Sequence, residues 1–238
     1  MAGAQKASAK WLKWAVAVAA LWPLCLVLTV AAFRLGSLVL LGGEAARNPL
    51  LLSFLGGAVA WWVCFVAGVK PMRAYLLGHE LTHAIWAWAF GGRVTALKVG
   101  PQGGYVRTDR VNFWISLAPY FFPLYGVLAA WLWWLAGFWV DLDGHLWVLL
   151  AVLGLAWGFH VSFTVMMLGR FQPDIAGEGW LFSLSLIYLL NLMPLVLLLV
   201  FVSPGLEAHD LWRAVEWSLG RLRDLGELGA AFLREYLR

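Results

Sequence analysis

Residues 72–90 read MRAYLLGHELTHAIWAWAF, an apolar run interrupted by the polar pattern His79-Glu80-x-x-His83. On a helix the two histidines lie four residues apart on one face, so both imidazoles can bind a single zinc ion. Glu80 then stands beside the metal as a proton acceptor, a combination typical of zinc-dependent hydrolysis. The alternative is two packed histidines and a buried glutamate, but ionisable groups inside a membrane helix are costly and are generally functional. We therefore expect a metal-binding helix here.

The composition of the 238-residue chain is that of a polytopic membrane protein. Hydrophobic residues make up 63% of the chain and charged residues only 13%, a balance that ordinary soluble domains do not show. The net charge of +4 is scattered over loops and tail, which gives no support to nucleic-acid binding. Crossing a hydrocarbon core takes roughly 20 helical residues. Apolar runs of about this length predict six transmembrane helices, at 11–33, 49–69, 72–90, 113–138, 146–169 and 179–202.

These runs divide the chain into three regions. Residues 1–48 are expected to form an N-terminal anchor helix and loop, and residues 49–204 a membrane-embedded core. The first run could pass for a signal peptide, but it is too long and lacks a clear cleavage site, which favours a retained anchor. In residues 205–238, apolar side chains recur at near-helical spacing among Arg and Glu. That pattern predicts an amphipathic tail helix on the membrane surface or against the bundle.

The segment between the third and fourth runs has the pattern of a β-hairpin. Two short β-rich pieces, 93–99 and 104–108, flank a turn that contains Gly and Pro. Next to the metal helix, such a hairpin would offer a strand edge with which an extended peptide can pair. A plain connecting loop is the alternative.

Two further stretches accompany the metal pattern: Gly103-Gly104-Tyr105-Val106 and the polar Gln172-Pro173-Asp174. With it they resemble the site-2 protease family of intramembrane zinc metalloproteases, particularly its compact bacterial members. The resemblance spans roughly residues 72–194 and implies a location in the bacterial inner membrane. It also implies roles for individual residues: Glu80 as the catalytic base, His79 and His83 as zinc ligands, Gly103, Gly104 and Tyr105 in the substrate-binding hairpin, and a later aspartate as third ligand.

The position of that aspartate is where the sequence departs from the family. Family members commonly carry it in an NLxPxxxLDG-like stretch, whereas here Asn191-Leu192-Met193-Pro194 matches the start and only apolar residues follow. Asp174 must then take the aspartate's place from an earlier position. Asn191 is left as a polar contact to substrate.

His160 is the alternative to Asp174 as the third metal ligand. Asp174 itself could instead be an ordinary loop carboxylate near Arg170. His160 lies well inside the fifth run, about 21 Å from Asp174 if the helix were unbroken. Gly169 and Pro173 make a regular helix through Asp174 implausible, so residues 170–178 can fold back into the bundle and carry the carboxylate inward. In the same run, Gly154 and Gly158 form a GxxxG pair, which predicts a close helix-packing face.

We expect an all-α membrane protein with about six transmembrane helices and one small β-hairpin. Its predicted activity is zinc-dependent hydrolysis of peptide bonds in or near the transmembrane segments of substrate proteins in the lipid bilayer. A transporter is one alternative, but an ion path would need polar residues in several runs, and here they cluster around one motif. A non-catalytic zinc-binding membrane protein is the other, and it leaves Glu80 without a role.

Overall fold

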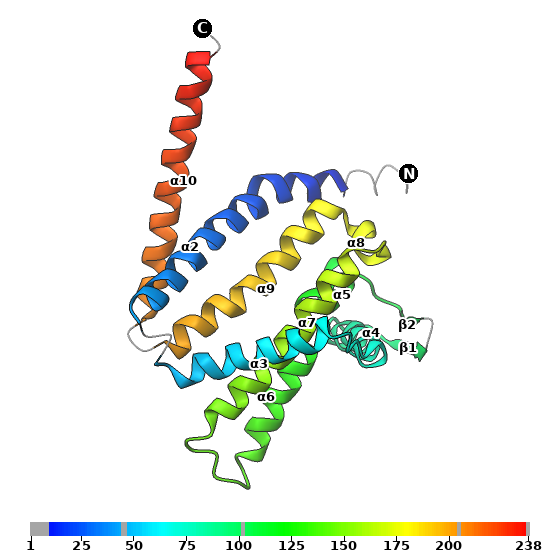
Figure 1. Ribbon diagram of the computed structural model, residues 1–238. Helices are drawn as coiled ribbons and strands as arrows, with labels where there is room; N and C mark the ends of the chain where they lie inside the picture. The colour runs from blue at the N-terminus through cyan, green and yellow to red at the C-terminus, as the bar shows by residue number, and fades with distance from the viewer. Residues whose placement is uncertain (1–9, 44–46, 101–102, 204–205, 237–238) are drawn as a thin grey trace, which may run out of the picture.

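A computed structural model describes residues 10–43, 47–100, 103–203 and 206–236. The chain is mostly helical, with one two-stranded hairpin (Figure 1). The elements run in chain order as η1 (Ala17–Leu21), α2 (Trp22–Leu41), α3 (Pro49–Val66), α4 (Met72–Ala89), β1 (Val94–Gly100), β2 (Gly103–Thr108), α5 (Phe113–Phe121), α6 (Leu124–Ala136), α7 (Leu146–Leu168), α8 (Pro173–Glu178), α9 (Trp180–Val202) and α10 (Ala208–Tyr236).

Within the described residues, four helices are long and apolar enough to cross a membrane: Lys10–Val39, Pro49–Val66, Leu146–Leu168 and Trp180–Val202. A fifth span results if α5 and α6 are counted together, although they meet at 74°. The expected helical membrane-type fold with a hairpin is therefore confirmed, with four or five apolar spans in place of six.

Two of the expected runs differ from a simple span, each for a local reason. The run at 113–138 is bent because Pro123 restricts the residue before it, and Phe122 is accordingly extended at φ −98° and ψ 104°. The run at 72–90 forms the regular helix α4. It is not among the apolar spans, because Arg73, Glu80 and the two histidines make it too polar.

Helices α3 and α7 cross in close contact through glycine. A Cβ atom built on Gly154 would lie 1.9 Å from the carbonyl oxygen of Phe54, and one built on Gly57 would lie 1.9 Å from that of Ala151. Gly158 faces the side chain of Trp61 in the same interface. The predicted close packing at the GxxxG pair is therefore present, and any side chain at Gly154 would push the helices apart.

The largest buried cluster joins residues of η1, α3, α4, α5, α7, α8 and α9. Leu117, Tyr120, Phe163 and Ile175 are fully buried in it. The ring of Tyr75 on α4 stacks on Phe163 of α7, with centroids 4.7 Å apart. This cluster fixes α4 against the helices that carry the remaining site residues.

The hairpin pairs β1 and β2 antiparallel, from Val94 opposite Thr108 to Gly100 opposite Gly103. The expected hairpin is confirmed, although Pro101 and Gln102 of its predicted turn lie outside the described residues. Gly103 has φ +137°, a conformation that side-chain-bearing residues rarely adopt.

The tail forms helix α10, and its first turns pack against α2. From residue 223 to residue 236 every side chain is exposed, and Figure 1 shows this part projecting away from the bundle.

Candidate metal centre

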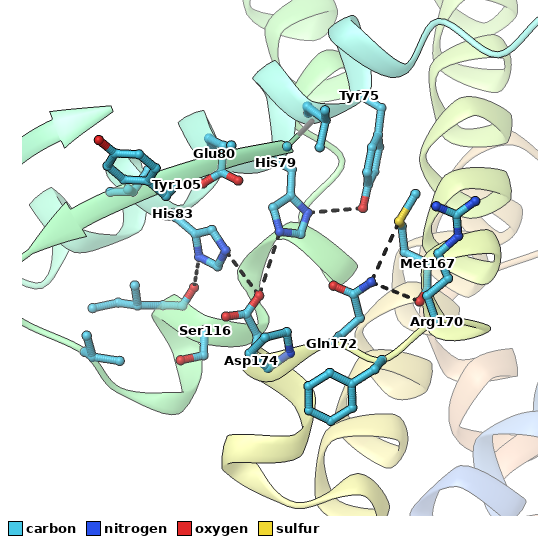
Figure 2. A pocket seen from close by; sticks show the side chains of 18 of the residues that line it. Tyr75, His79, Glu80, His83, Tyr105, Ser116, Met167, Arg170, Gln172 and Asp174 are labelled. Atoms are coloured by element: carbon cyan, nitrogen blue, oxygen red, sulfur yellow. Dashed lines mark hydrogen bonds and ion pairs between the residues drawn. The ribbon is translucent and has the colours of Figure 1, made fainter. Parts of the chain in front are cut away.

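Helix α4 directs His79 and His83 toward Asp174, which lies on the short helix α8 (Figure 2). The Nε2 atoms of His79 and His83 lie 3.9 Å and 3.6 Å from Oδ2 of Asp174. One ligand atom from each of the three side chains can be chosen so that all lie within 4.8 Å of one another. The structure thus brings together the three residues predicted to bind the metal.

The other nitrogen of each histidine is held by a neighbouring group. Nδ1 of His83 lies 2.8 Å from the carbonyl oxygen of Ile115. Because a carbonyl only accepts, this nitrogen carries the proton, and the lone pair of a neutral ring is on Nε2. Nδ1 of His79 lies 3.2 Å from the hydroxyl of Tyr75, one turn earlier on α4. Such contacts fix the ring orientation of metal-binding histidines.

Asp174 reaches the histidines because the chain reverses after α7. That helix ends at Leu168, Gly169 follows, and Pro173 starts α8 at the first helical position, where its missing N–H costs nothing. The expected return of residues 170–178 into the bundle is therefore present. Buried Ile175 anchors α8 on the core, and the Ser183 hydroxyl donates to the Ile175 carbonyl oxygen at 3.3 Å.

Tyr120 on α5 holds the carboxylate from another direction. Its hydroxyl contacts Oδ2 of Asp174 at 3.4 Å and Oε1 of Gln172 at 3.1 Å. Burial alone would raise the pKa of Asp174. When the rings are protonated, hydrogen bonds and charge attraction from His79 and His83 outweigh burial, so the pKa of Asp174 lies below its ordinary value.

The three side chains fit a metal ion. Tetrahedral coordination with bonds of about 2.0–2.2 Å sets ligand atoms roughly 3.3–3.6 Å apart. The two histidine–carboxylate separations, 3.6 Å and 3.9 Å, differ from that range by a few tenths of an ångström at most. Two imidazoles and an ionised carboxylate are also a donor set that divalent metals accept. This group can therefore hold a metal ion after small side-chain movements.

Glu80 follows His79 on α4 and is buried, with 7% of its surface exposed. Its side chain lies against β2 at Gly104, where an added Cβ atom would be 2.6 Å from Cγ of Glu80 and 2.9 Å from the carbonyl oxygen of Lys98. Within the described residues, no hydrogen bond engages its carboxylate. Glu80 is therefore held close to the two histidines with its oxygens available.

A pocket of about 650 Å³ opens in front of these groups. It is bounded by α4, by β2 and by residues 170–174 (Figure 2). Gly103, Gly104 and Tyr105, the hairpin residues predicted to bind substrate, all line it. An extended segment entering the pocket would meet β2 along one wall.

Asn191 and His160 lie elsewhere. Asn191 is not among the residues that line the pocket; its amide donates to the carbonyl oxygens of Tyr120 at 2.9 Å and of Ile187 at 2.8 Å. It therefore braces α5 near the tyrosine that contacts Asp174. His160 is buried and does not belong to the three-residue group. It lines a separate cavity of about 20 Å³ that His79 also borders, and its Nε2 has no partner among the described residues.

Sequence reasoning missed Tyr75 and Tyr120. Tyr75 lies four residues before His79, so helical spacing alone could have pointed to it. Tyr120 comes from a different helix, and no local pattern connects it with Asp174.

The chain was compared with protein-family models, with curated proteins and with solved structures, and none of the three comparisons gave a match. Its function is therefore inferred from its residues and their geometry.

Proposed function

We propose that the protein is an integral membrane zinc metalloendopeptidase that hydrolyses peptide bonds in or near transmembrane segments of substrate proteins. One observation carries the proposal: His79, His83 and Asp174 converge beside buried Glu80, in a pocket with a β-strand along its wall. The resemblance of the motifs to the site-2 proteases agrees with it.

The donor set favours zinc. Two histidines and one carboxylate form the three-ligand set of many catalytic zinc sites, in which a fourth position stays open. Zinc bound there would polarise a scissile carbonyl and lower the pKa of a water molecule toward neutrality.

Glu80 accepts the proton of the attacking water on its carboxylate and passes it to the leaving amine. Its position next to His79 in the chain brings it within reach of the same space, and contact with Gly104 limits how far its side chain can swing. The Ile115 carbonyl and the Tyr75 hydroxyl keep the two imidazoles oriented during this proton transfer.

Strand β2 binds the substrate in this proposal. A transmembrane helix satisfies its backbone hydrogen bonds internally, so its peptide bonds become accessible only when a segment unwinds. A free strand edge replaces the lost hydrogen bonds by pairing with the unwound segment. Gly103 has no side chain and open space where one would stand, which permits close approach of another backbone at the pocket wall.

The proposal also places the helix that carries the candidate metal ligands His79 and His83 within the membrane. We take α4 as a sixth helix at membrane depth, shielded by the apolar spans, with His79, Glu80 and His83 turned toward the pocket. The side chains of His79 and His83 are only 11% and 14% exposed, which supports such shielding. By resemblance to the compact site-2 proteases, the membrane is the bacterial plasma membrane.

Purified full-length protein in detergent tests the proposal, with bound zinc measured together with cleavage of a panel of single-span substrates. Glu80→Gln is expected to keep its zinc and to lose at least about a hundredfold in rate, because general acid–base catalysis contributes that much. Glu216→Gln, on the exposed face of α10, is the matched control and should leave both unchanged. Absence of zinc in the wild type, or undiminished turnover in Glu80→Gln, would contradict the proposal.

A further inference from the structure

Helix α8, which carries Asp174, has only six residues. So short a helix is not stable by itself, because the free-energy cost of nucleating a helix exceeds the stabilisation that a single turn provides. The position of Asp174 is therefore determined by the contacts that hold α8. Ile175 and Ser183 hold it from the core side, and Tyr120 contacts the carboxylate itself.

A further contact holds the opposite end of α8. Glu178, its last residue, forms an ion pair with Lys13, which lies 165 positions earlier in the chain. The exposed fractions of the two side chains are 29% for Lys13 and 14% for Glu178, so solvent screens this pair less than a surface pair. The Lys13 ammonium also lies 5.9 Å from the ring centroid of Phe182 on α9.

The geometry connects this ion pair with the candidate metal centre. Asp174 and Glu178 are four residues apart, so they lie about one turn apart on the same side of α8. A rotation or shift of α8 that releases Glu178 also moves the Asp174 carboxylate relative to His79 and His83. Lys13 belongs to the N-terminal span Lys10–Val39, and no residue of that span lines the pocket.

We propose that Lys13 is a positioning residue for the metal centre: by pairing with Glu178, it holds α8 so that Asp174 stays directed at the two histidines. The N-terminal span is then part of the machinery that sets metal affinity. This inference rests on the proposed function in one respect, namely that the group His79, His83 and Asp174 binds zinc.

A charge-swap experiment tests it on the full-length protein. The variants are Lys13→Glu, Glu178→Lys and the double variant that carries both changes. Each single variant should bind zinc about tenfold more weakly, within the roughly 5- to 150-fold range usual for coupled sites. The double variant should recover most of the loss, because it restores an ion pair of opposite polarity. Zinc affinity is measured by competition with a chelator, and the visible spectrum of the cobalt-substituted protein reports ligand geometry.

Lys10→Glu is the matched control, because Lys10 lies one turn earlier on the same helix and has no carboxylate within ion-pair distance among the described residues. It reveals any effect of charge reversal on membrane insertion alone. If a reversal variant does not fold, the neutral pair Lys13→Gln and Glu178→Gln takes its place. Each neutral variant should then weaken zinc binding, and combining them should add little further loss.

The outcomes separate the two hypotheses. Single variants with wild-type zinc affinity and an unchanged cobalt spectrum would overturn the role of Lys13 while leaving the zinc protease proposal intact. Strictly additive losses in the double variant would do the same. A wild-type protein without zinc would instead remove the proposed function. If the proposal holds, the single variants also lose kcat with little change in KM, a pattern that general loosening of the fold would not produce.

Discussion

Gly104→Ala measures how closely the hairpin must lie against Glu80. The added Cβ atom would be 2.6 Å from Cγ and 2.8 Å from Oε1 of Glu80, and 2.9 Å from the backbone carbonyl oxygen of Lys98. Ordinary contacts of such an atom begin near 3.4 Å. Relief therefore requires Glu80 or β2 to move by roughly 0.5–1 Å, and a misplacement of about 1 Å can cost on the order of a hundredfold in rate.

We expect the kcat of Gly104→Ala to fall about a hundredfold, or about 2.7 kcal/mol of transition-state stabilisation at 1.36 kcal/mol per factor of ten. Zinc should stay bound, because none of the three proposed ligands contacts Gly104. The assay is single-turnover cleavage of a single-span substrate, together with zinc content. Gly100→Ala is the control on the same hairpin, since its added Cβ atom would meet nothing closer than 3.7 Å. Cleavage by Gly104→Ala within threefold of the control would refute the reasoning.

Three further predictions concern the candidate metal ligands and the packing of the bundle. Asp174→Ala should strip the zinc, whereas His160→Ala should keep it and lower activity only modestly; the reverse pattern of zinc content would exchange their roles. Tyr120→Phe removes a hydrogen bond to the carboxylate and should weaken zinc binding about 10- to 100-fold in a chelator competition, the usual effect of such outer contacts. Gly154→Ala places a methyl group 1.9 Å from a carbonyl oxygen of α3 and should lower the thermal unfolding temperature. The control Gly36→Ala, whose added Cβ atom would meet nothing within 4 Å, should leave that temperature unchanged. Equal unfolding temperatures of the two variants would rule out the close packing as a source of stability.

The sequence predicts those parts of the molecule that local rules determine. Helical spacing puts His79 and His83 on one face, and both strands of the hairpin are recognisable from their composition. The return of Asp174 follows from two helix breakers, Gly169 and Pro173. Each of these inferences needs only residues that are close together in the chain.

Contacts between distant segments leave no such pattern. Asn191 was predicted to contact substrate because it begins a stretch that matches a family motif. In the structure its amide donates to the carbonyl oxygens of Tyr120 and Ile187, contacts that the sequence does not indicate. Lys13 and Glu178 form an ion pair, but no sequence pattern around either residue indicates this contact. Of the six expected spans, four or five are apolar enough to cross a membrane, because Pro123 breaks the run at 113–138 and polar residues interrupt α4.

The return of α8 has a consequence for the order in which the protein matures during synthesis. The histidine pair leaves the ribosome about 90 residues before Asp174 does. At about 5–20 residues per second, that interval lasts on the order of 5 to 20 seconds. Throughout it the nascent chain holds two of the three candidate metal ligands, and the carboxylate that completes the set is added only after α7 is made. If the proposed activity is correct, the nascent chain cannot cleave its own membrane segments before α8 is made, because the third candidate ligand is still missing.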